Sequence, residues 1–354
     1  MTRIVHVINS LAQIGGAERL VLDLAKCSKE RPVTVISWWG RDNSLMASDV
    51  DGAIDLIAVC PFNWKALTRA LNAIKRAEVV HLHLFPTLYL GPFINKPTLY
   101  TEHNTWNRRR DRPALRPIER WCYSRINKVV AISKATANAL TDWLGEPPPK
   151  LSVISNGVRL SRFDNVPRRH RGGPVVLGMA ARFSFEKDHR TLIEAMAYLP
   201  NSYSLRLAGD GELFENIKMF ARQQGVFDRV DFAGVIQDMP EFYRSLDLYV
   251  QSSKYDGFSL VAVEAMASGL PTLVSDIEGL RCTVGNVQLL FPAADAHALA
   301  RLITRIAQDA ELYESLAIYC VGQSQKFSIT EVANHYEFAY AELAEVGRPP
   351  SNGG

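Results

Sequence analysis

The chain has 354 residues, 47% of them apolar and 22% charged, and its length favours two domains over one. Its five cysteines, Cys27, Cys60, Cys122, Cys282 and Cys320, exclude a short zinc motif and a disulfide scaffold, so we expect free thiols in a reducing compartment. The net charge of +3 is uneven, since residues 1–171 hold 26 basic and 14 acidic residues and residues 172–354 hold 14 and 23, which indicates an anionic partner for the first half.

Strand-like apolar runs alternate with helical patterns along the chain, which is typical of parallel α/β domains. The most apolar window, residues 79–94, is interrupted by two histidines and two prolines, so it is too short and too polar to span a bilayer. Arg3 opens a strand rather than a signal peptide, so we expect a cytoplasmic protein. In the first half we expect a loop at residues 10–16, a helix over residues 17–28 and strands over residues 3–9, 33–39, 79–84, 98–101 and 128–132.

Residues 166–174 are basic and rich in Pro and Gly, as in a linker. We therefore expect two doubly wound domains over residues 1–168 and 173–329, with a helix at about residues 330–346 that can pack back on the first. Such sheets bind ligands at the carboxyl ends of their strands, here in a cleft between the domains. The second domain is expected to contain strands over residues 175–181, 205–209, 230–234, 248–251, 272–275 and 289–291.

The first loop argues against a nicotinamide cofactor. Such a site needs G-x-G-x-x-G after the first strand and an acidic residue at the end of the second. This loop has only Gly15 and Gly16, and the second strand ends in Trp38, Trp39 and Gly40.

The most informative segment is Ser253–Pro271, with the sequence SKYDGFSLVAVEAMASGLP. Asp256 lies in a loop after a strand, and a helix is expected from about Ser259 until Gly269 and Pro271 end it. Glu264 leans back toward the start of this helix. Two carboxylates can therefore converge on one ligand there, beside amides that favour an anion. A sugar nucleotide requires this combination.

The segment resembles the Glu-x7-Glu motif of family 4, the retaining glycosyltransferases of the two-Rossmann (GT-B) fold, with Asp256 in place of the first Glu. The resemblance covers nearly the whole chain in the right order. It includes Gly15–Glu18, Asn156–Val158, Gly178–Lys187, Gly209–Gly211, Asp231–Gly234 with Asp247, and Leu289–Leu299.

The resemblance implies roles for individual residues. Arg182 and Lys187 would hold the donor diphosphate, Glu264 the ribose, and Asp256 the transferred sugar. His103 would lie beside the reacting carbon. Further donor contacts would come from Gly15, Gly16, Gly209, Gly234, Gly257, Phe258, Ser259 and Leu260. Asp256 is one methylene shorter than Glu, and Asp188 follows Lys187 where Gly is usual, so sugar recognition and the diphosphate loop can differ from the family pattern.

Structural interpretations compete with several of these roles. Glu264, Arg182 and Lys187 are also compatible with solvated surface charges, and His103 with a buried structural histidine. Gly209–Gly211 fits a tight turn better than a ligand set. His81 and His83 share a strand face, but with no third ligand we expect no metal site. Asp49-Val50-Asp51 resembles a D-x-D metal motif but lies in a polar stretch expected to be solvated.

By resemblance, the reaction is a front-face substitution in which protein cations replace a metal, so we expect no cofactor and no metal. Two alternatives stay open: a sugar-nucleotide epimerase of the same fold, and a catalytically silent sugar-nucleotide-binding protein. We expect a glycan or lipid-linked acceptor, no nucleic acid, and cell-surface polysaccharide or glycolipid assembly.

Basic and aromatic residues are dense between Trp106 and Lys128. One interpretation is a solvated helix face with a few packed aromatics. The other is a surface for an acceptor or an anionic membrane, which would place the protein on the inner face of the cell membrane. The residues expected to form it are Glu102, Trp106, Arg108, Arg109, Arg110 and Arg112.

Overall fold

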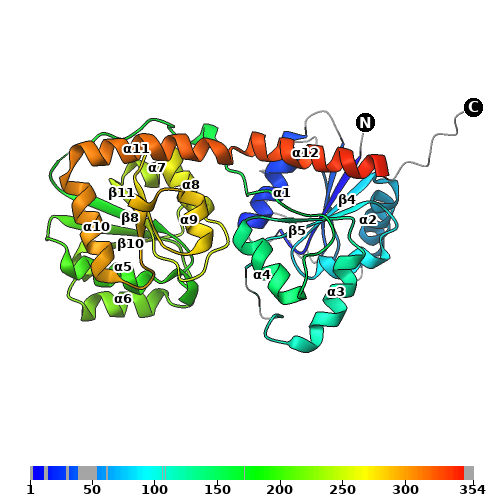
Figure 1. The fold of residues 1–354 in the computed structure, drawn as a ribbon, viewed down its shortest axis with the longest axis horizontal. Coiled ribbons are helices and arrows are strands. Elements are labelled where there is room, and N and C mark those ends of the chain that lie inside the picture. Colours follow the sequence, from blue (N-terminus) through cyan, green and yellow to red (C-terminus); the bar gives the residue numbers. More distant parts are fainter. Residues whose placement is uncertain are drawn as a thin grey trace, which may run out of the picture. The chain divides into compact units, whose positions relative to one another are not determined.

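The computed structural model describes residues 3–11, 15–28, 32–38, 54–60, 63–105, 107, 109–170 and 172–346. The chain divides into two compact units (Figure 1). Unit 1 contains residues 1–157 and 329–354, and unit 2 is Val158–Ser328. The chain therefore changes unit after Gly157, before the basic linker-like segment, and returns to unit 1 after Ser328.

Unit 1 is built on a seven-stranded parallel sheet in the order β3-β2-β1-β4-β5-β6-β7. The strands are β1 (Ile4–Ile8), β2 (Val33–Ser37), β3 (Ile54–Ala58), β4 (Val79–His83), β5 (Thr98–Glu102), β6 (Lys128–Ala131) and β7 (Leu151–Val153). The helices are α1 (Gly16–Cys27), α2 (Trp64–Arg76), η1 (Thr87–Phe93), η2 (Pro113–Leu115), α3 (Arg116–Ser124), α4 (Lys134–Leu144) and α12 (Ile329–Val346).

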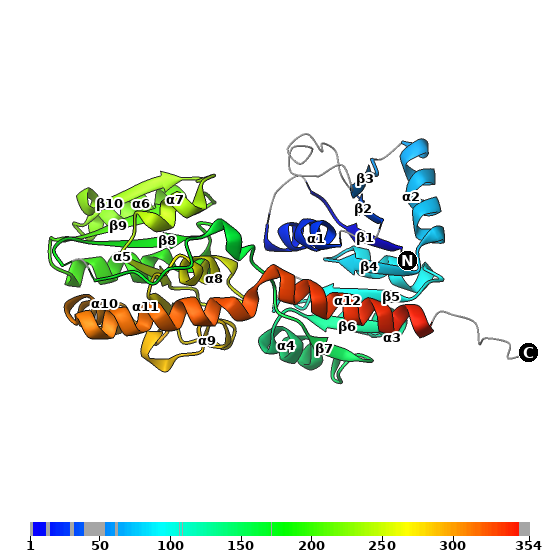
Figure 2. The same cartoon turned by 90° about the horizontal axis from the view of Figure 1, so that it is seen from above.

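Alternation along the strands decides which helices cover which face of this sheet. Val5, Val80 and Tyr100 pack with residues of α2, α3 and α4. Ile4 and Val79 directly precede Val5 and Val80 on their strands, so they lie on the other face of the sheet. There they pack with residues of α1 and α12. Figures 1 and 2 show α12 running beside α1. The last helix of the chain thus completes the core of unit 1.

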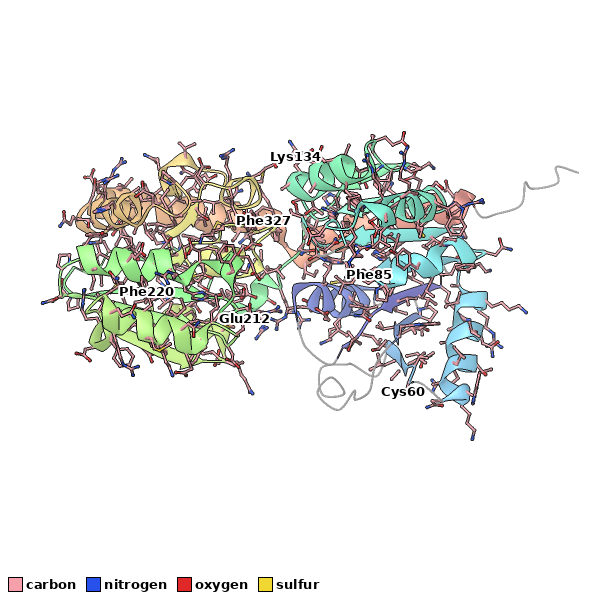
Figure 3. The ribbon with its side chains drawn as sticks, turned by 90° about the horizontal axis from the view of Figure 1, so that it is seen from below. Cys60, Phe85, Lys134, Glu212, Phe220 and Phe327 are labelled. Carbon is pink, nitrogen blue, oxygen red and sulfur yellow. The ribbon has the colours of Figure 1, made fainter. Side chains whose placement is uncertain are left out.

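Unit 2 repeats the plan with a six-stranded parallel sheet in the order β10-β9-β8-β11-β12-β13. Its core includes Phe220, labelled in Figure 3, whose ring centroid lies 3.8 Å from the Arg190 guanidinium. The strands are β8 (Val175–Ala180), β9 (Tyr203–Ala208), β10 (Val230–Gly234), β11 (Leu248–Gln251), β12 (Thr272–Ser275) and β13 (Leu290–Phe291). The helices are η3 (Leu160–Arg162), η4 (Phe185–Lys187), α5 (His189–Tyr198), α6 (Phe214–Gln223), η5 (Phe227–Arg229), α7 (Met239–Arg244), α8 (Leu260–Ala267), α9 (Glu278–Val284), η6 (Val287–Leu289), α10 (Ala296–Gln308), α11 (Ala310–Ser324) and η7 (Gln325–Phe327).

Each sheet has a topological switch point. From β1 the chain adds β2 and β3 on one side and then moves to β4 on the other, and from β8 it adds β9 and β10 before β11. In doubly wound sheets ligands bind at the carboxyl ends of the two strands that flank this reversal. The expected fold class, two doubly wound parallel α/β domains, is confirmed, and it directs attention to the ends of β1 and β4 and of β8 and β11.

Candidate functional site

Two loops meet at the switch point of unit 2. The loop after β8 carries Arg182 and Lys187, and the loop after β11 carries Asp256. Because β8 and β11 are paired in parallel, both loops emerge at one edge, and Nζ of Lys187 lies 2.7 Å from Oδ2 of Asp256. The Lys187 and Asp256 side chains are 24% and 8% exposed, whereas Arg182 is exposed. The structure thus joins Lys187 to Asp256 and leaves Arg182 at the solvent.

A buried row of hydrogen-bonded polar side chains leads from β11 to Asp256. The Tyr249 hydroxyl donates to Oε1 of Gln251 at 2.8 Å, and Nε2 of Gln251 donates to Oγ of Ser253 at 2.9 Å. Ser253 in turn lies 3.4 Å from Oδ2 of Asp256. Burial raises the pKa of Tyr249 above its usual range, so its hydroxyl remains a donor. Gln251, the last residue of β11, and Ser253 were not among the predicted residues, although polar side chains at the end of an apolar strand were the available signal.

Asp188 occupies a backbone position that normally favours glycine. Its φ is 49°, in the left-handed region that Asp tolerates better than most residues. Its carboxylate accepts a hydrogen bond from Thr191 at 2.7 Å and lies 3.4 Å from Nζ of Lys254. Asp188 therefore adopts in the loop after β8 the backbone conformation that a glycine would adopt, and its own side-chain partners stabilise that conformation.

Glu264 is bound by a tyrosine of unit 2. It lies in the middle of α8, is 6% exposed, and accepts a hydrogen bond from Tyr243 at 2.9 Å. The helix begins as expected, with Ser259 as N-cap accepting from the Ala262 amide at 3.3 Å. Around this start Ser259 is buried, while Gly257, Phe258 and Leu260 are half-buried.

Two glycines let the backbone of unit 2 approach itself closely at the site. Gly209 has a φ of 132°, and a Cβ there would lie 2.0 Å from the Ala181 carbonyl oxygen. Its amide donates to the Gly234 carbonyl at 2.7 Å, so Gly209 and Gly234 support the turn next to Arg182. A Cβ on Gly279 would lie 2.0 Å from the Asp256 carbonyl oxygen. The start of α9 therefore packs directly on the Asp256 loop, a contact that the sequence analysis missed.

The corresponding edge of unit 1 contains the other predicted residues. Gly15 and Gly16 are exposed at the start of α1, where the Gly15 amide donates to Glu18 at 3.0 Å. His103 follows β5 and is buried, and burial lowers its pKa to about 3. Its Nδ1 has no hydrogen-bond partner among the residues that the structure describes.

Glu102 and two of the predicted arginines form internal contacts. Glu102 is buried, accepts from the Tyr123 hydroxyl at 2.8 Å and lies 3.8 Å from Arg110. Arg109 pairs with the buried Glu119 at 2.6 Å. Its guanidinium also lies 4.4 Å from the ring centroid of Phe85, which Figure 3 labels.

Their placement limits the surface expected from the sequence. The side chains of Arg109 and Arg110 are only 11% and 9% exposed, so they stabilise the β5–α3 region rather than present charge to the outside. Arg112 is exposed. Trp106 and Arg108 lie outside the described residues, as do Asp49 and Asp51.

A possible metal-ligand group lies in unit 1, where the sequence analysis found only two candidates. His6 of β1 pairs in register with His81 of β4. The expectation that His81 and His83 have no third ligand is therefore wrong. One nitrogen from each of His6, His81 and His83 can be chosen so that all three lie within 4.8 Å of one another, and all three rings are buried.

No helix within the described ranges is long and apolar enough to cross a membrane.

Comparison with known proteins gives the same division of the chain. "Glycosyltransferase Family 4" matches residues 14–162, and "Glycosyl transferases group 1" matches residues 162–320. The lipopolysaccharide core biosynthesis glycosyltransferase LpsE of Rhizobium meliloti is 35% identical over 192 residues, 51% of this chain and 56% of LpsE. A glycogen synthase of Mycobacterium tuberculosis is 27% identical over 252 residues, 66% of this chain and 61% of that protein. The matches thus span less than two thirds of either relative.

A solved structure extends the likeness to the whole fold. The crystal structure of Anabaena HepE in complex with UDP superposes with a TM-score of 0.84 at 20% identity, covering 97% of this chain and all of HepE. The order of the two matched segments along the chain and the presence of two doubly wound sheets agree with the same family assignment. This chain belongs to the glycosyltransferases of group 1 and Family 4.

Proposed function

We propose that this chain is a retaining glycosyltransferase that moves a hexosyl or N-acetylhexosaminyl residue from a nucleotide-diphosphate sugar to a glycan or lipid-linked acceptor. The observation that carries the proposal is the Lys187–Asp256 pair at the switch point of unit 2. There a cation suited to a diphosphate and a carboxylate suited to sugar hydroxyls lie 2.7 Å apart.

The surroundings of the pair supply the other groups that a sugar nucleotide needs. Arg182 is an exposed second cation in the loop of Lys187. The first-turn amides of α8 lack partners inside the helix and favour negative charge. Glu264 offers carboxylate oxygens for ribose hydroxyls. The UDP in the HepE structure supports a nucleotide donor, and the relationship to LpsE supports a role in cell-surface polysaccharide or glycolipid assembly.

In the proposed reaction the bond from the anomeric carbon to the diphosphate oxygen breaks. The acceptor oxygen bonds to the same face of the sugar, which retains the configuration, and the leaving diphosphate takes the acceptor's proton. Arg182 and Lys187 offset the charge that develops on the diphosphate, so this mechanism requires no metal. We expect activity to survive excess EDTA. Loss that magnesium or manganese restores would instead favour Asp49 and Asp51 as ligands.

An acceptor attached to a membrane lipid fits one exposed face of unit 1. Helix α3 and the neighbouring η1 expose Phe93, Ile118 and Trp121, which are 80%, 52% and 46% accessible. Phe93 and Trp121 meet edge to face with ring centroids 6.4 Å apart. The exposed Arg112 and Arg120 belong to the same segment of the chain, where Arg120 also pairs with Glu146 at 2.6 Å. We call the three apolar residues and the two arginines the α3 face. Apolar rings beside arginines suit the headgroup level of an anionic membrane.

Two other functions would use the same donor site. An epimerase would change the donor without an acceptor, and a silent binding protein would return it unchanged. The match of Asp256–Pro271 to the transferase motif argues against an epimerase, and the basic first half argues for a separate acceptor.

The test starts with a thermal-shift screen of UDP-glucose, UDP-galactose, UDP-N-acetylglucosamine and GDP-mannose, because a bound ligand raises the melting temperature. The best donor, labelled in its sugar, is then incubated with the protein and a lipid extract of Gram-negative envelopes, and the products are chromatographed. A labelled lipid or glycan with retained anomeric configuration supports the proposal. An epimerised sugar supports the first alternative, and unchanged donor supports the second.

A further inference from the structure

Four buried histidines of unit 1 gather at its switch point. His6 lies on β1, His81 and His83 lie on β4, and His103 follows β5. His6 is the register partner of His81, and His83 is the register partner of Thr101. The histidines of β1 and β4 are at most 1% exposed, so their polar atoms must find partners within the protein.

The cluster consists of two separate hydrogen-bonded rows. In the first, Nδ1 of His81 lies 2.8 Å from the Tyr340 hydroxyl, and Nε2 lies 2.7 Å from Oγ1 of Thr101. The Tyr336 hydroxyl lies 3.2 Å from the same Thr101 oxygen. Both nitrogens of His81 therefore contact hydroxyl groups, one from Thr101 and one from Tyr340 of α12. Tyr336, also of α12, contacts the Thr101 hydroxyl.

The second row, which we call the histidine row, consists of His6, His83 and His103. Nδ1 of His6 lies 3.0 Å from Nε2 of His83, and Nδ1 of His83 lies 3.4 Å from Nε2 of His103. The row ends at Nδ1 of His103, which has no partner within the described part of the chain. One buried polar atom at the carboxyl edge of β5 is thus left to meet a ligand.

We propose that His83 is a positioning residue for His103, holding Nε2 of that ring so that Nδ1 faces the substrate, and that His6 fixes His83 in turn. The proposal rests on the function proposed above and on the role of His103 that the family resemblance implies, beside the reacting carbon. Burial lowers the pKa of His6 to about 4 and that of His103 to about 3, and burial followed by the neighbouring histidines lowers that of His83. Each nitrogen–nitrogen contact of the row also needs one unprotonated acceptor, which favours neutral rings.

Neutrality couples the tautomers along the histidine row. A neutral imidazole has one donor nitrogen and one acceptor nitrogen. If His6 donates from Nδ1, then His83 must donate from Nδ1 and His103 keeps its proton on Nδ1. If the row runs the other way, Nδ1 of His103 is an acceptor. In either direction His83 gives the His103 ring one defined tautomer instead of a mixture.

A metal ion held by His6, His81 and His83 is the competing interpretation. It would have to displace at least one hydroxyl partner of His81. The two hydrogen-bonded rows account for the same contacts without displacing any of them.

Two substitutions of His83 separate its two hydrogen bonds. His83→Asn retains a polar group near the position of Nδ1, toward His103, and loses the one that meets His6. His83→Gln retains a polar group near the position of Nε2, toward His6, and loses the one that meets His103. Both variants replace the imidazole ring with an amide. A difference between them therefore reports which hydrogen bond is retained rather than the loss of the ring. Thermal melting and donor binding are measured first to show that both are folded.

The primary readout is the ¹⁵N NMR spectrum of the histidine rings, recorded without donor or acceptor. We expect a single neutral tautomer for His103 in the wild type and in His83→Asn, and averaged tautomers in His83→Gln. We expect kcat to fall about tenfold in His83→Gln, as for one lost hydrogen bond, with the KM for the donor within about twofold and a smaller loss in His83→Asn.

The outcomes distinguish the positioning role from its alternatives. An unchanged His103 tautomer in both variants, or equal losses of kcat in both, overturns the proposal. So does one equivalent of zinc or another transition metal in the purified wild-type protein. The spectrum needs no turnover, so it tests the histidine row even if no transfer reaction is found. A defined His103 tautomer in a protein without transfer activity would count against the proposed function alone.

Discussion

Lys187 and Asp256 neutralise each other at the site, and this pairing decides how each can be replaced. Asp256 shares Oδ2 between Lys187 at 2.7 Å and Ser253 at 3.4 Å. Arriving diphosphate oxygens would compete with that carboxylate for the lysine. In the donor site proposed above, the Asp256 carboxylate would thus occupy the place of a substrate anion on Lys187, while Arg182 is exposed.

Replacing the two cations by alanine should therefore have different consequences. Arg182→Ala and Lys187→Ala should each lower kcat/KM for the donor by about tenfold to a hundredfold, because each removes a charge-assisted contact of roughly 1.5–3 kcal/mol. Only Lys187→Ala should also lower the free energy of unfolding, by about 1–3 kcal/mol, since it leaves the largely buried Asp256 unpaired. Steady-state kinetics and urea denaturation check both effects. Near-wild-type turnover in both variants would remove these residues from the donor site.

The effect of side-chain length at position 256 can be tested in the same way. Asp256→Glu keeps the charge and should be tolerated or shift donor preference, whereas Asp256→Ala should cost at least tenfold more in kcat/KM because the sugar loses its acceptor group. Competition between pairs of labelled donors measures the preference. Equal and small effects of both substitutions would place this side chain outside the site and favour the silent binding protein.

Arg182, Lys187, Asp256 and Glu264 could be selected as candidates from the sequence because each belongs to a motif that is continuous in the chain. His6 was not, since its contact with His83 depends on β1 lying beside β4, 77 residues away. Gly279 likewise acts through a backbone contact with another loop. The internal pairing of Arg109 with Glu119 was also hidden, because composition shows a basic segment but not which of its charges are buried.

At the level of elements, the strands that the sequence analysis did not anticipate are β3 and β7, the two edges of the unit 1 sheet. β3 buries only Ile54 and Ile57 fully, and β7 has no fully buried residue. Central strands are covered on both faces and form continuous apolar runs that are easily recognised. Edge strands bury less surface, so their sequences show less of the pattern.

Helix α12 gives the clearest test at this scale, because it supplies both core rings and hydroxyl groups to unit 1. Tyr336 and Tyr340 are at most 2% exposed, whereas Phe338 on the same helix is 74% exposed. Tyr336→Ala and Tyr340→Ala should each lower the free energy of unfolding by about 3–5 kcal/mol, as for other large aromatic truncations.

Phe338→Ala is the matched control, expected to change the free energy of unfolding by less than about 0.5 kcal/mol. Tyr340→Phe should cost about 1 kcal/mol, because only the hydroxyl contact with His81 is lost. Urea denaturation followed by circular dichroism measures all four variants. A Phe338→Ala effect as large as that of Tyr340→Ala would contradict this account of α12.

At the scale of the whole molecule, charge is distributed by sequence half, with a basic first part and an acidic second part. Some of the basic charge is internal, as Arg109 and Arg110 show. The exposed remainder includes the arginines of the α3 face, beside aromatic rings. By unit the contrast is much smaller, with 22 basic and 17 acidic residues in unit 1 and 18 and 20 in unit 2, so the proposed attraction to an anionic surface rests on the exposed arginines of the α3 face.

Binding to vesicles tests this distribution. The wild type should sediment with vesicles containing anionic phosphatidylglycerol at low salt and be released by a few hundred millimolar NaCl, because each basic residue near the surface contributes about 1 kcal/mol that salt screens. The combined substitution Arg112→Ser, Arg120→Ser and Trp121→Ser should weaken this binding without changing donor affinity.

The control replaces two exposed arginines of unit 2, Arg190→Ser and Arg301→Ser, which change the net charge equally. We expect this variant to bind anionic vesicles like the wild type. If the wild type ignores anionic vesicles at low salt, or if both sets of substitutions act equally, a soluble acceptor becomes the better explanation.

The division of the chain also sets an order of events during synthesis. Unit 2 is a continuous segment whose ends are joined, since the Val158 amide donates to the Phe327 carbonyl at 2.8 Å. Unit 1 begins first but lacks α12, with Tyr336 and Tyr340, until the ribosome has passed unit 2. Unit 1 therefore acquires its complete set of elements only after unit 2 has been synthesised. A fragment of residues 158–328 should melt cooperatively by itself, whereas residues 1–157 should do so only when a peptide of residues 329–346 is added.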